Sequence, residues 1–328
     1  MGERKWIRFM VLLFSLVILC GVQPDRAGWN RGGERAQAAT VRKAGSLREL
    51  ERALSLQTDM EIILENHITV NRLLAVRGKK TINGNGKYQL IRKTGTDQYG
   101  GTLLYLHQGT LRLKKVTLNG GGRSGGARPD VNGKLVEVSA GMVILDRGAK
   151  LRTNYNTLSF TDGGGGITIH KGGKALMKKG SEICDNLTIT VGSGVRVEGG
   201  TISENAVFGQ GEENDFDGRG GAIHNRGIVW IQGGVIGENR AVGYEKKGQV
   251  FGGFGGAVYN QNLLRITGGI IRDNQAALAG GAIYTNEAGT VSMEGGELVK
   301  NCARNQRGGG IYVSAASNVT IQGGKIWG

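Results

Sequence analysis

The strongest constraint on the fold is a short glycine phrase that recurs in the second half of the chain. A Gly-Gly pair is followed by a small residue, an aliphatic residue and then His or Tyr, as in "GGAIHN", "GGAVYN", "GGAIYT" and "GGGIYV". These copies begin at Gly220, Gly255, Gly280 and Gly308. Their intervals are unequal, so we expect a constant core with loops of variable length.

Two further phrases accompany each copy. One is aliphatic-x-aliphatic before a Gly-Gly pair, as at Val229 and Ile231. The other is x-aliphatic-x-x-Asn, which ends at Asn205, Asn239, Asn274 and Asn301, with a weaker copy ending at Asn186. Each unit therefore contains three short segments in which apolar residues alternate, and alternation is typical of strands with one buried face.

Units of about twenty to thirty-five residues built this way predict coils that stack on one another. One coil cannot bury its own aliphatic row, but rows stacked about 4.8 Å apart can. We therefore expect an all-β parallel solenoid with three short strands per coil. Its most specific prediction is that Ile223, Val258, Ile283 and Ile311 point inward and lie one beneath another.

The phrases Gly-Gly-Ala-Ile and x-aliphatic-x-x-Asn resemble the repeats of right-handed parallel β-helix surface proteins, including polymorphic outer-membrane and adhesin-like proteins. The resemblance covers about residues 164–328, although the Asn phrase here starts with Ile or Leu where the outer-membrane group usually has Phe. Residues 60–163 fit loosely, and "EIILENHITV" is similar to the first coils of pectin-lyase-like proteins. The resemblance implies a right-handed β-helix, a fold that also houses polysaccharide lyases and hydrolases.

Residues 1–38 have the pattern of a secretory signal peptide. Arg4, Lys5 and Arg8 precede an apolar segment, Phe9–Val22, that is too short for a comfortable membrane span. We expect cleavage before Ala39 and a secreted or cell-surface protein. Processing as a lipoprotein at Cys20 is the alternative, which the preceding Leu19 disfavours.

The remaining chain divides into an N-terminal cap and a long solenoid. In residues 39–60, Ser46 and Glu49 form a capping box, and Leu47, Leu50 and Leu54 share one helical face. We expect this short helix to close the first coil of a β-helix over residues 61–328. The last phrase, "VTIQGGKIWG", stops in mid-unit, which predicts either a truncated chain or another protein covering the exposed edge.

Composition limits the class of protein and the kind of partner. With 60 Gly but only two Pro, the chain is not collagen-like. After removal of residues 1–38, Lys and Arg fall from 42 to 36 and Asp and Glu from 27 to 24, leaving a net charge of +12. Such a chain attracts anionic envelope polymers or polysaccharides, although the cations are equally consistent with a solvated surface. No motif indicates nucleic-acid binding.

The recurring Asn residues predict a structural ladder, in which stacked amides hydrogen-bond along the solenoid axis. Cys184 and Cys302 lie several coils apart, about 19 Å at the usual strand spacing, so they should not form a disulfide. We expect both to pack as small apolar residues near the Asn corner.

One outward aromatic or His follows each inward aliphatic residue: His224, Tyr259, Tyr284 and Tyr312. Such a stripe suits sugar rings or an apolar partner, and these four residues are therefore ligand-binding candidates. The structural alternative is that the rings stack on one another and shield the sheet.

Two long insertions at the same corner of successive coils form the second candidate surface. The first carries Glu212, Glu213, Asp215 and Asp217, and the second carries Tyr244, Lys246 and Lys247. Asp215 and Asp217 are the only calcium candidates, but regular acidic spacing is missing, and opposite charges on adjacent loops can pair instead. We otherwise predict no cofactor and no metal.

Catalytic residues cannot be assigned from the sequence. The adjacent Asp-Asp and Gly-His-Gly phrases of hydrolases with this fold are missing, and Asp146, Asp162, Asp185 and Asp273 are isolated. The four His show no metal spacing. We therefore expect an adhesin-like or polysaccharide-binding protein. A polysaccharide lyase or glycoside hydrolase whose carboxylates converge only in space is the alternative, and a structural segment of a longer surface protein is a third reading.

Overall fold

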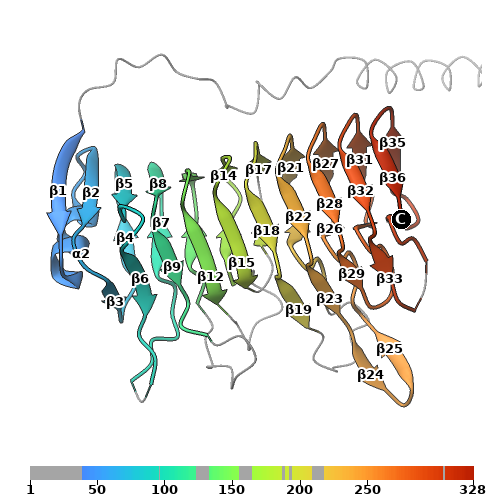
Figure 1. Ribbon diagram of the computed structural model, residues 1–328, viewed down its shortest axis with the longest axis horizontal. Helices are drawn as coiled ribbons and strands as arrows, with labels where there is room; N and C mark the ends of the chain where they lie inside the picture. The colour runs from blue at the N-terminus through green and yellow to red at the C-terminus, as the bar shows by residue number, and fades with distance from the viewer. Residues whose placement is uncertain are drawn as a thin grey trace, which may run out of the picture. The chain divides into compact units, whose positions relative to one another are not determined.

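The computed structural model describes residues 39–328, apart from residues 96, 123–132, 155–164, 187–188, 192–193, 209–217 and 306. Over this range the chain is an all-β parallel solenoid (Figure 1). The strands of successive units lie side by side along the long axis, and the chain visits the sheets in a fixed order. The predicted fold class, an all-β parallel solenoid, is confirmed.

One helix occurs in the described residues, and it lies against the first strands. Helix α2 spans Leu47–Ser55 and begins with the predicted capping box between Ser46 and Glu49. Within this helix, the side chains of Leu50, Ala53 and Leu54 are buried. A short strand, Thr40–Ala44, lies before the helix in the sequence and pairs with the strand Met60–Leu64 that comes after it. The first sheet therefore begins before the cap helix.

Sheet 1 contains eleven of the described strands, and it is the first that the chain enters in each unit. All its neighbours pair in parallel. Its strands are β1 (Thr40–Ala44), β2 (Met60–Leu64), β5 (Lys79–Asn83), β8 (Thr110–Lys114), β11 (Gly141–Leu145), β14 (Gly173–Met177), β17 (Gly194–Val197), β21 (Ile228–Ile231), β27 (Leu263–Ile266), β31 (Thr290–Met293) and β35 (Asn318–Ile321).

Sheet 2 follows sheet 1 across a corner and leads to the Asn residues. Its strands are β3 (Ile68–Val70), β6 (Gln89–Arg92), β9 (Thr117–Asn119), β12 (Lys150–Asn154), β15 (Glu182–Asn186), β18 (Thr201–Ser203), β22 (Val235–Gly237), β28 (Ile270–Arg272), β32 (Glu297–Val299) and β36 (Lys325–Trp327).

Sheet 3 completes the unit before the chain returns to sheet 1. Its strands are β4 (Leu74–Val76), β7 (Leu104–Leu106), β10 (Val136–Val138), β13 (Ile167–Ile169), β16 (Ile189–Val191), β20 (Ile223–Asn225), β26 (Val258–Asn260), β30 (Ile283–Thr285) and β34 (Ile311–Val313).

Between sheets 2 and 3, the later units carry extra structure. A small sheet 4 contains β19 (Ala206–Phe208), β23 (Arg240–Val242), β29 (Gln275–Ala276) and β33 (Cys302–Ala303). An antiparallel hairpin of β24 (Tyr244–Lys246) and β25 (Gln249–Phe251) projects beyond it, at the lower right of Figure 1. The variable intervals in the sequence therefore belong to this corner.

The predicted inward row is present in register. Ile223 pairs with Val258, Val258 with Ile283, and Ile283 with Ile311. The first three are fully buried, and Ile311, in the last strand of sheet 3, is partly buried. One apolar core thus runs through the described solenoid, from Ala44 near its start to Leu298 in its later coils.

The Gly-Gly phrase is needed for backbone geometry. Gly280 has a φ of +68°, a value that L side chains rarely adopt. A Cβ there would also collide with the carbonyl oxygen of Ile283, because the chain folds tightly back on itself. Gly220, Gly255 and Gly308 have the same sign of φ, so the phrase marks one recurring corner.

The last strands leave apolar side chains exposed. Val313, Ile321, Ile326 and Trp327 are each about half exposed in β34, β35 and β36. Among the described residues, none of the helical structure is long and apolar enough to cross a bilayer.

Candidate functional site

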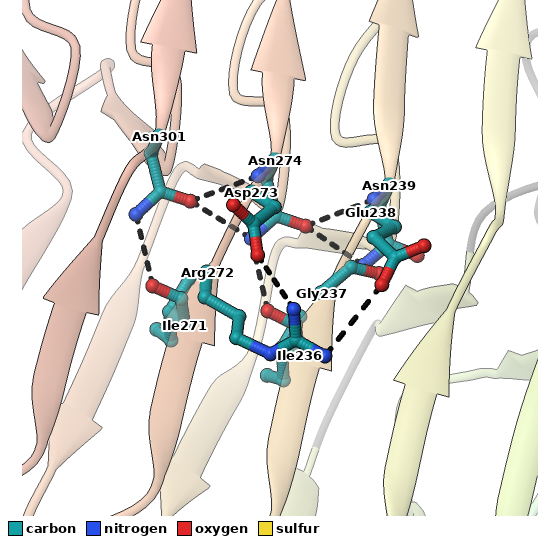
Figure 2. A network of polar contacts seen from close by, with 9 residues as sticks. All are labelled: Ile236, Gly237, Glu238, Asn239, Ile271, Arg272, Asp273, Asn274 and Asn301. Atoms are coloured by element: carbon teal, nitrogen blue, oxygen red, sulfur yellow. Dashed lines mark hydrogen bonds and ion pairs between the residues drawn. The ribbon is translucent and has the colours of Figure 1, made fainter. Parts of the chain in front are cut away.

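A column of asparagine side chains runs along the corner after sheet 2 (Figure 2). Nδ2 of Asn239 donates to Oδ1 of Asn274 over 2.8 Å, and Nδ2 of Asn274 donates to Oδ1 of Asn301 over 2.9 Å. Asn205 makes the same contact with Asn239 at its N-terminal side. The predicted ladder is confirmed, and its first three amides are fully buried.

The ladder extends further toward the N-terminus than the repeated phrase suggests. The backbone N–H of Asn154 donates to Oδ1 of Asn186 over 3.0 Å, and that of Asn186 donates to Oδ1 of Asn205 over 3.1 Å. Each amide oxygen therefore accepts from the preceding coil. This common direction gives the column a donor end and an acceptor end.

Arg92 lies at the acceptor end of this column. Its Nη2 donates to Oδ1 of Asn154 over 2.9 Å. The guanidinium also donates to the backbone carbonyls of Tyr99, Gly101, Gly133 and Lys134. Burial lowers the pKa of Arg92 to about 10, which leaves it charged at neutral pH. The sequence alone did not identify this residue, because its partners are far away along the chain.

On the outer side of the ladder, Arg272 lies across Gly237 (Figure 2). It contacts Asp273 over 2.6 Å and Glu238 over 3.5 Å. Asp273 and Glu238 both have positive φ values, of 54° and 60°, directly before a ladder Asn. Arg272 therefore bridges the two carboxylates at this corner through partly exposed ion pairs.

A second, shorter polar column follows sheet 3. Nδ2 of Asn225 donates to Oδ1 of Asn260 over 2.7 Å, and Nδ2 of Asn260 donates to the hydroxyl of Thr285 over 3.2 Å. All three side chains are fully buried. Their signal in the sequence is the polar residue that ends each "GGAIHN"-like phrase.

The predicted aromatic stripe exists, but its rings stack on one another. The rings of Tyr259 and Tyr284 have centroids 5.3 Å apart and planes 5° apart, and Tyr284 and Tyr312 are arranged alike at 5.1 Å and 7°. His224 meets Tyr259 edge to face at 5.3 Å. The arrangement is thus the structural alternative, in which the rings stack on one another and shield the sheet.

The expectation of an exposed stripe is wrong for most of its length. Tyr259 is fully buried, and only 8% of His224 and of Tyr284 is exposed. Phe254 and Leu278 pack over the rings, and the guanidinium of Arg219 lies 5.4 Å from the Tyr259 ring. The corner segments that follow sheet 4 therefore cover the stripe, and they were not anticipated because their sequence lacks a regular period.

The electrostatic state of His224 follows from this burial. Desolvation lowers the pKa of His224 to about 4, although a hydrogen bond to the Gln261 amide oxygen acts to raise it. Nε2 of His224 lies 2.8 Å from Oε1 of Gln261. His224 is therefore neutral at pH 7 and contributes packing rather than charge.

The second insertion forms the β24–β25 hairpin. Tyr244 and Phe251 stack across it with ring centroids 5.4 Å apart and an interplanar angle of 18°. Lys246 and Lys247 are exposed at its turn. The calcium candidates Asp215 and Asp217, with Glu212 and Glu213, lie outside the described residues.

The N-terminal part of sheet 3 presents another group of polar side chains. Nε2 of His170 lies 2.8 Å from Oε1 of Glu137, and the Thr102 hydroxyl donates to Oε2 of the same carboxylate over 3.0 Å. Tyr105, the register neighbour of Glu137, stacks with His107 at 6.5 Å. No sequence motif marks this group, because its residues are separated by whole coils.

Two of the four isolated carboxylates considered for catalysis form ion pairs. Asp146 contacts Arg112 over 2.6 Å, and Asp273 contacts Arg272. Asp185 has a positive φ before Asn186, and Asp162 lies outside the described residues. Within the part of the chain that the structure describes, no three His, Cys, Asp or Glu side chains form a metal site.

Cys184 and Cys302 form no disulfide, as predicted, but they differ in environment. Cys184 is buried, and its thiol donates to Glu182 over 3.0 Å. Burial, with Glu182 acting in the same direction, raises the pKa of Cys184 to about 12. Cys302 is exposed, which corrects the expectation that both pack as apolar residues. It begins β33, at the end of sheet 4.

Together the fold and these contacts define a parallel β-solenoid with internal polar ladders. No protein-family model matches the chain, and comparisons with curated proteins and with solved structures give no match.

Proposed function

We propose that this chain is an exported β-solenoid, secreted or held at the cell surface, that binds a polysaccharide or other envelope polymer in an adhesin-like way. The repeat phrases, which resemble those of β-helix surface proteins, and the secretory pattern of residues 1–38 support this proposal. The solenoid supplies a rigid support, and the projecting β24–β25 hairpin supplies the ligand contacts.

The observation that carries the proposal is the construction of the hairpin. An isolated two-stranded hairpin is marginally stable in water, so the stacked Tyr244 and Phe251 rings are needed to hold it. Lys246 and Lys247 are exposed where the hairpin projects. Ring edges beside ammonium groups suit sugar units that carry acidic substituents.

The test is binding of the full chain to a panel of neutral and acidic polysaccharides. The double variant K246A/K247A should lose about threefold to tenfold in affinity for the acidic members, because each exposed ion pair contributes modestly. The variant Y244A should weaken binding to every member that the wild type binds, because it removes the ring pair.

The control is K171A/K300A, which removes two exposed lysines elsewhere. It should bind like the wild type. Unchanged affinity in K246A/K247A and Y244A, with both variants folded, would remove the hairpin from the proposed function.

One observation favours a second candidate, a polysaccharide lyase or hydrolase. A carboxylate that holds a histidine ring in place is a common arrangement of a general base. Glu137 and His170 have this geometry, and 47% of the His170 side chain is exposed, so a substrate can reach it.

Incubation with the same polymers tests this candidate. An enzyme would release products with new unsaturated or reducing ends, and H170N and E137Q would each abolish the release. Absence of products across the panel, or release that survives both substitutions, would exclude this site as the catalytic centre.

A further inference from the structure

The corner between sheets 1 and 2 changes character along the solenoid. The position that changes lies two residues after the last inward-pointing side chain of each sheet 1 strand. This position is basic in three successive coils, where it is Lys115, Arg147 and Lys179. In the next five coils the same position is glycine: Gly199, Gly233, Gly268, Gly295 and Gly323.

The three cations lie in adjacent coils. The backbone N–H of Lys115 donates to the carbonyl of Arg147 over 3.2 Å, and a Cβ on Gly199 would lie 3.0 Å from Cα of Lys179. Gly148 and Gly180, which follow Arg147 and Lys179, are hydrogen-bonded at 2.8 Å. The side chains therefore form a single exposed file at the coil spacing of about 4.8 Å.

The carboxylates beside this file already have other partners. Asp146 contacts Arg112 over 2.6 Å, and Glu182 contacts Lys150 over 2.8 Å. Burial acts to raise the pKa of Asp146, yet the Arg147 N–H, Arg112 and Lys178 together hold it below its ordinary value. Asp146 is thus an ionised carboxylate whose charge is offset by Arg112. Lys178 adds a further cation next to the file.

Elsewhere the chain places opposite charges in register. Lys150 pairs with Glu182 across sheet 2, and Glu297 pairs with Lys325. Like charges in neighbouring coils repel, so a file of three cations is destabilising unless an anionic ligand screens it. The file is therefore an exception to the way this solenoid distributes charge.

We propose that the corner at Lys115, Arg147 and Lys179 binds a linear polyanion that lies along the solenoid axis, with an anionic group at each of these coils. Past Lys179, the equivalent position of this corner is glycine and so has no side chain there. A shallow hollow of about 470 Å³ follows there, lined by Gly268, Gly269, Ile270, Gly296, Glu297, Gly324 and Lys325. The shared chemistry is a single row of phosphodiester or carboxylate groups.

This inference goes beyond the proposed function, because it uses another corner and does not depend on the hairpin. A single file of cations fits a single-file polymer better than duplex DNA, which presents two phosphate strands. We therefore favour an envelope-type polymer and treat DNA as a competing outcome.

The experiment measures binding of the full chain to poly(glycerol phosphate), polygalacturonate, neutral dextran and duplex DNA at two salt concentrations. The variant K115Q/R147Q/K179Q should lose at least about tenfold in affinity for a polyanion, and its binding should depend less on salt. The control R48Q/K171Q/K300Q removes the same charge from exposed sites, and Lys300 matches Lys115 in its positive φ.

The conservative variant K115R/K179R should keep wild-type affinity, which separates loss of charge from loss of fold. Preference for poly(glycerol phosphate) or for polygalacturonate identifies the anionic group. Equal loss in the control variant, wild-type binding in the corner variant, binding of neither polymer, or corner-dependent binding of DNA alone would each overturn the proposal. The hairpin variant K246A/K247A should leave binding of poly(glycerol phosphate) unchanged, because that polymer has no sugar rings for the hairpin to contact. The two sites are therefore distinguishable.

Discussion

Nη2 of Arg92 donates a hydrogen bond to Oδ1 of Asn154 over 2.9 Å, across a sequence separation of 62 residues. Every amide oxygen between Asn154 and Asn301 accepts from the preceding coil, so the column of amides has aligned dipoles. A cation at the acceptor end stabilises such an alignment, as it does at a helix C-terminus. Arg92 thus gives the ladder a charged N-terminal end inside the core.

The first prediction concerns this residue. Arg92→Met should lower the free energy of unfolding by about 3–5 kcal/mol, because several buried carbonyls and the Asn154 amide oxygen lose their donor. Chemical denaturation of the purified protein measures the loss. Arg152→Met, in the neighbouring coils but exposed, should change the value by less than about 0.5 kcal/mol. Equal effects of both substitutions would contradict a special role for Arg92.

The second prediction compares two positions in the ladder. Asn239 donates from Nδ2 to Ile202, Gly237 and Asn274, whereas Asn301, partly exposed, donates to Ile271. Asn239→Ala should therefore cost about 2–4 kcal/mol and Asn301→Ala about 1 kcal/mol, because unpaired buried groups cost most where water cannot reach them. Thermal unfolding gives both values, and a larger effect at Asn301 would be inconsistent with the ladder energetics.

Much of the fold could be predicted because the same residue pattern recurs in successive units of the solenoid. Ile223, Val258, Ile283 and Ile311 occupy equal places in equal phrases, and parallel pairing brings equal places together. The Asn ladder follows from the same logic. Glycine at a corner is also readable, since few other residues tolerate a φ near +70°.

Features that depend on unequal parts of the units could not be predicted. Phe254 and Leu278 cover the tyrosine stack from segments without a period, so Tyr259 is buried although its strand alternation makes it outward. At the end of the ladder, the guanidinium of Arg92 takes the place of an Asn amide, and no repeat phrase in the sequence indicates this. Glu137 and His170 meet only because two coils stack, and their identities match no motif.

The third prediction tests the tyrosine stack. Tyr284 lies between Tyr259 and Tyr312, whereas Tyr312 has a ring neighbour on one side among the described residues. Tyr284→Ala should cost about 3–5 kcal/mol and Tyr312→Ala markedly less, because only the first leaves a cavity in a covered cluster. Tyr284→Phe keeps the ring and should cost about 1 kcal/mol. Near-equal losses for Tyr284→Ala and Tyr284→Phe would argue against packing as the cause.

The fourth prediction uses the two thiols of the solenoid. Cys302 is exposed and should be alkylated within minutes by iodoacetamide at pH 8, while Cys184 should react only on unfolding. Burial and Glu182 hold the pKa of Cys184 near 12, so little thiolate forms even at alkaline pH. Peptide mapping by mass spectrometry assigns each modification to its residue. Rapid labelling of Cys184 in the native protein would contradict its placement in sheet 2.

The last prediction is a pH dependence carried by His224. Burial lowers its folded-state pKa to about 4, from 6.5 in the unfolded chain. Between these values the unfolded state binds a proton that the folded state does not, so stability is fully present above pH 6.5 and falls as the pH drops toward 4. The contribution is about 3 kcal/mol over that range. His224→Gln should flatten this part of the stability curve, whereas His107→Asn, at an exposed position, should keep the wild-type slope. Denaturation at several pH values from 7 to 4 gives the free energy of unfolding as a function of pH. If its slope were the same for the wild type and His224→Gln, then His224 would not be buried in the neutral form beside the tyrosine stack.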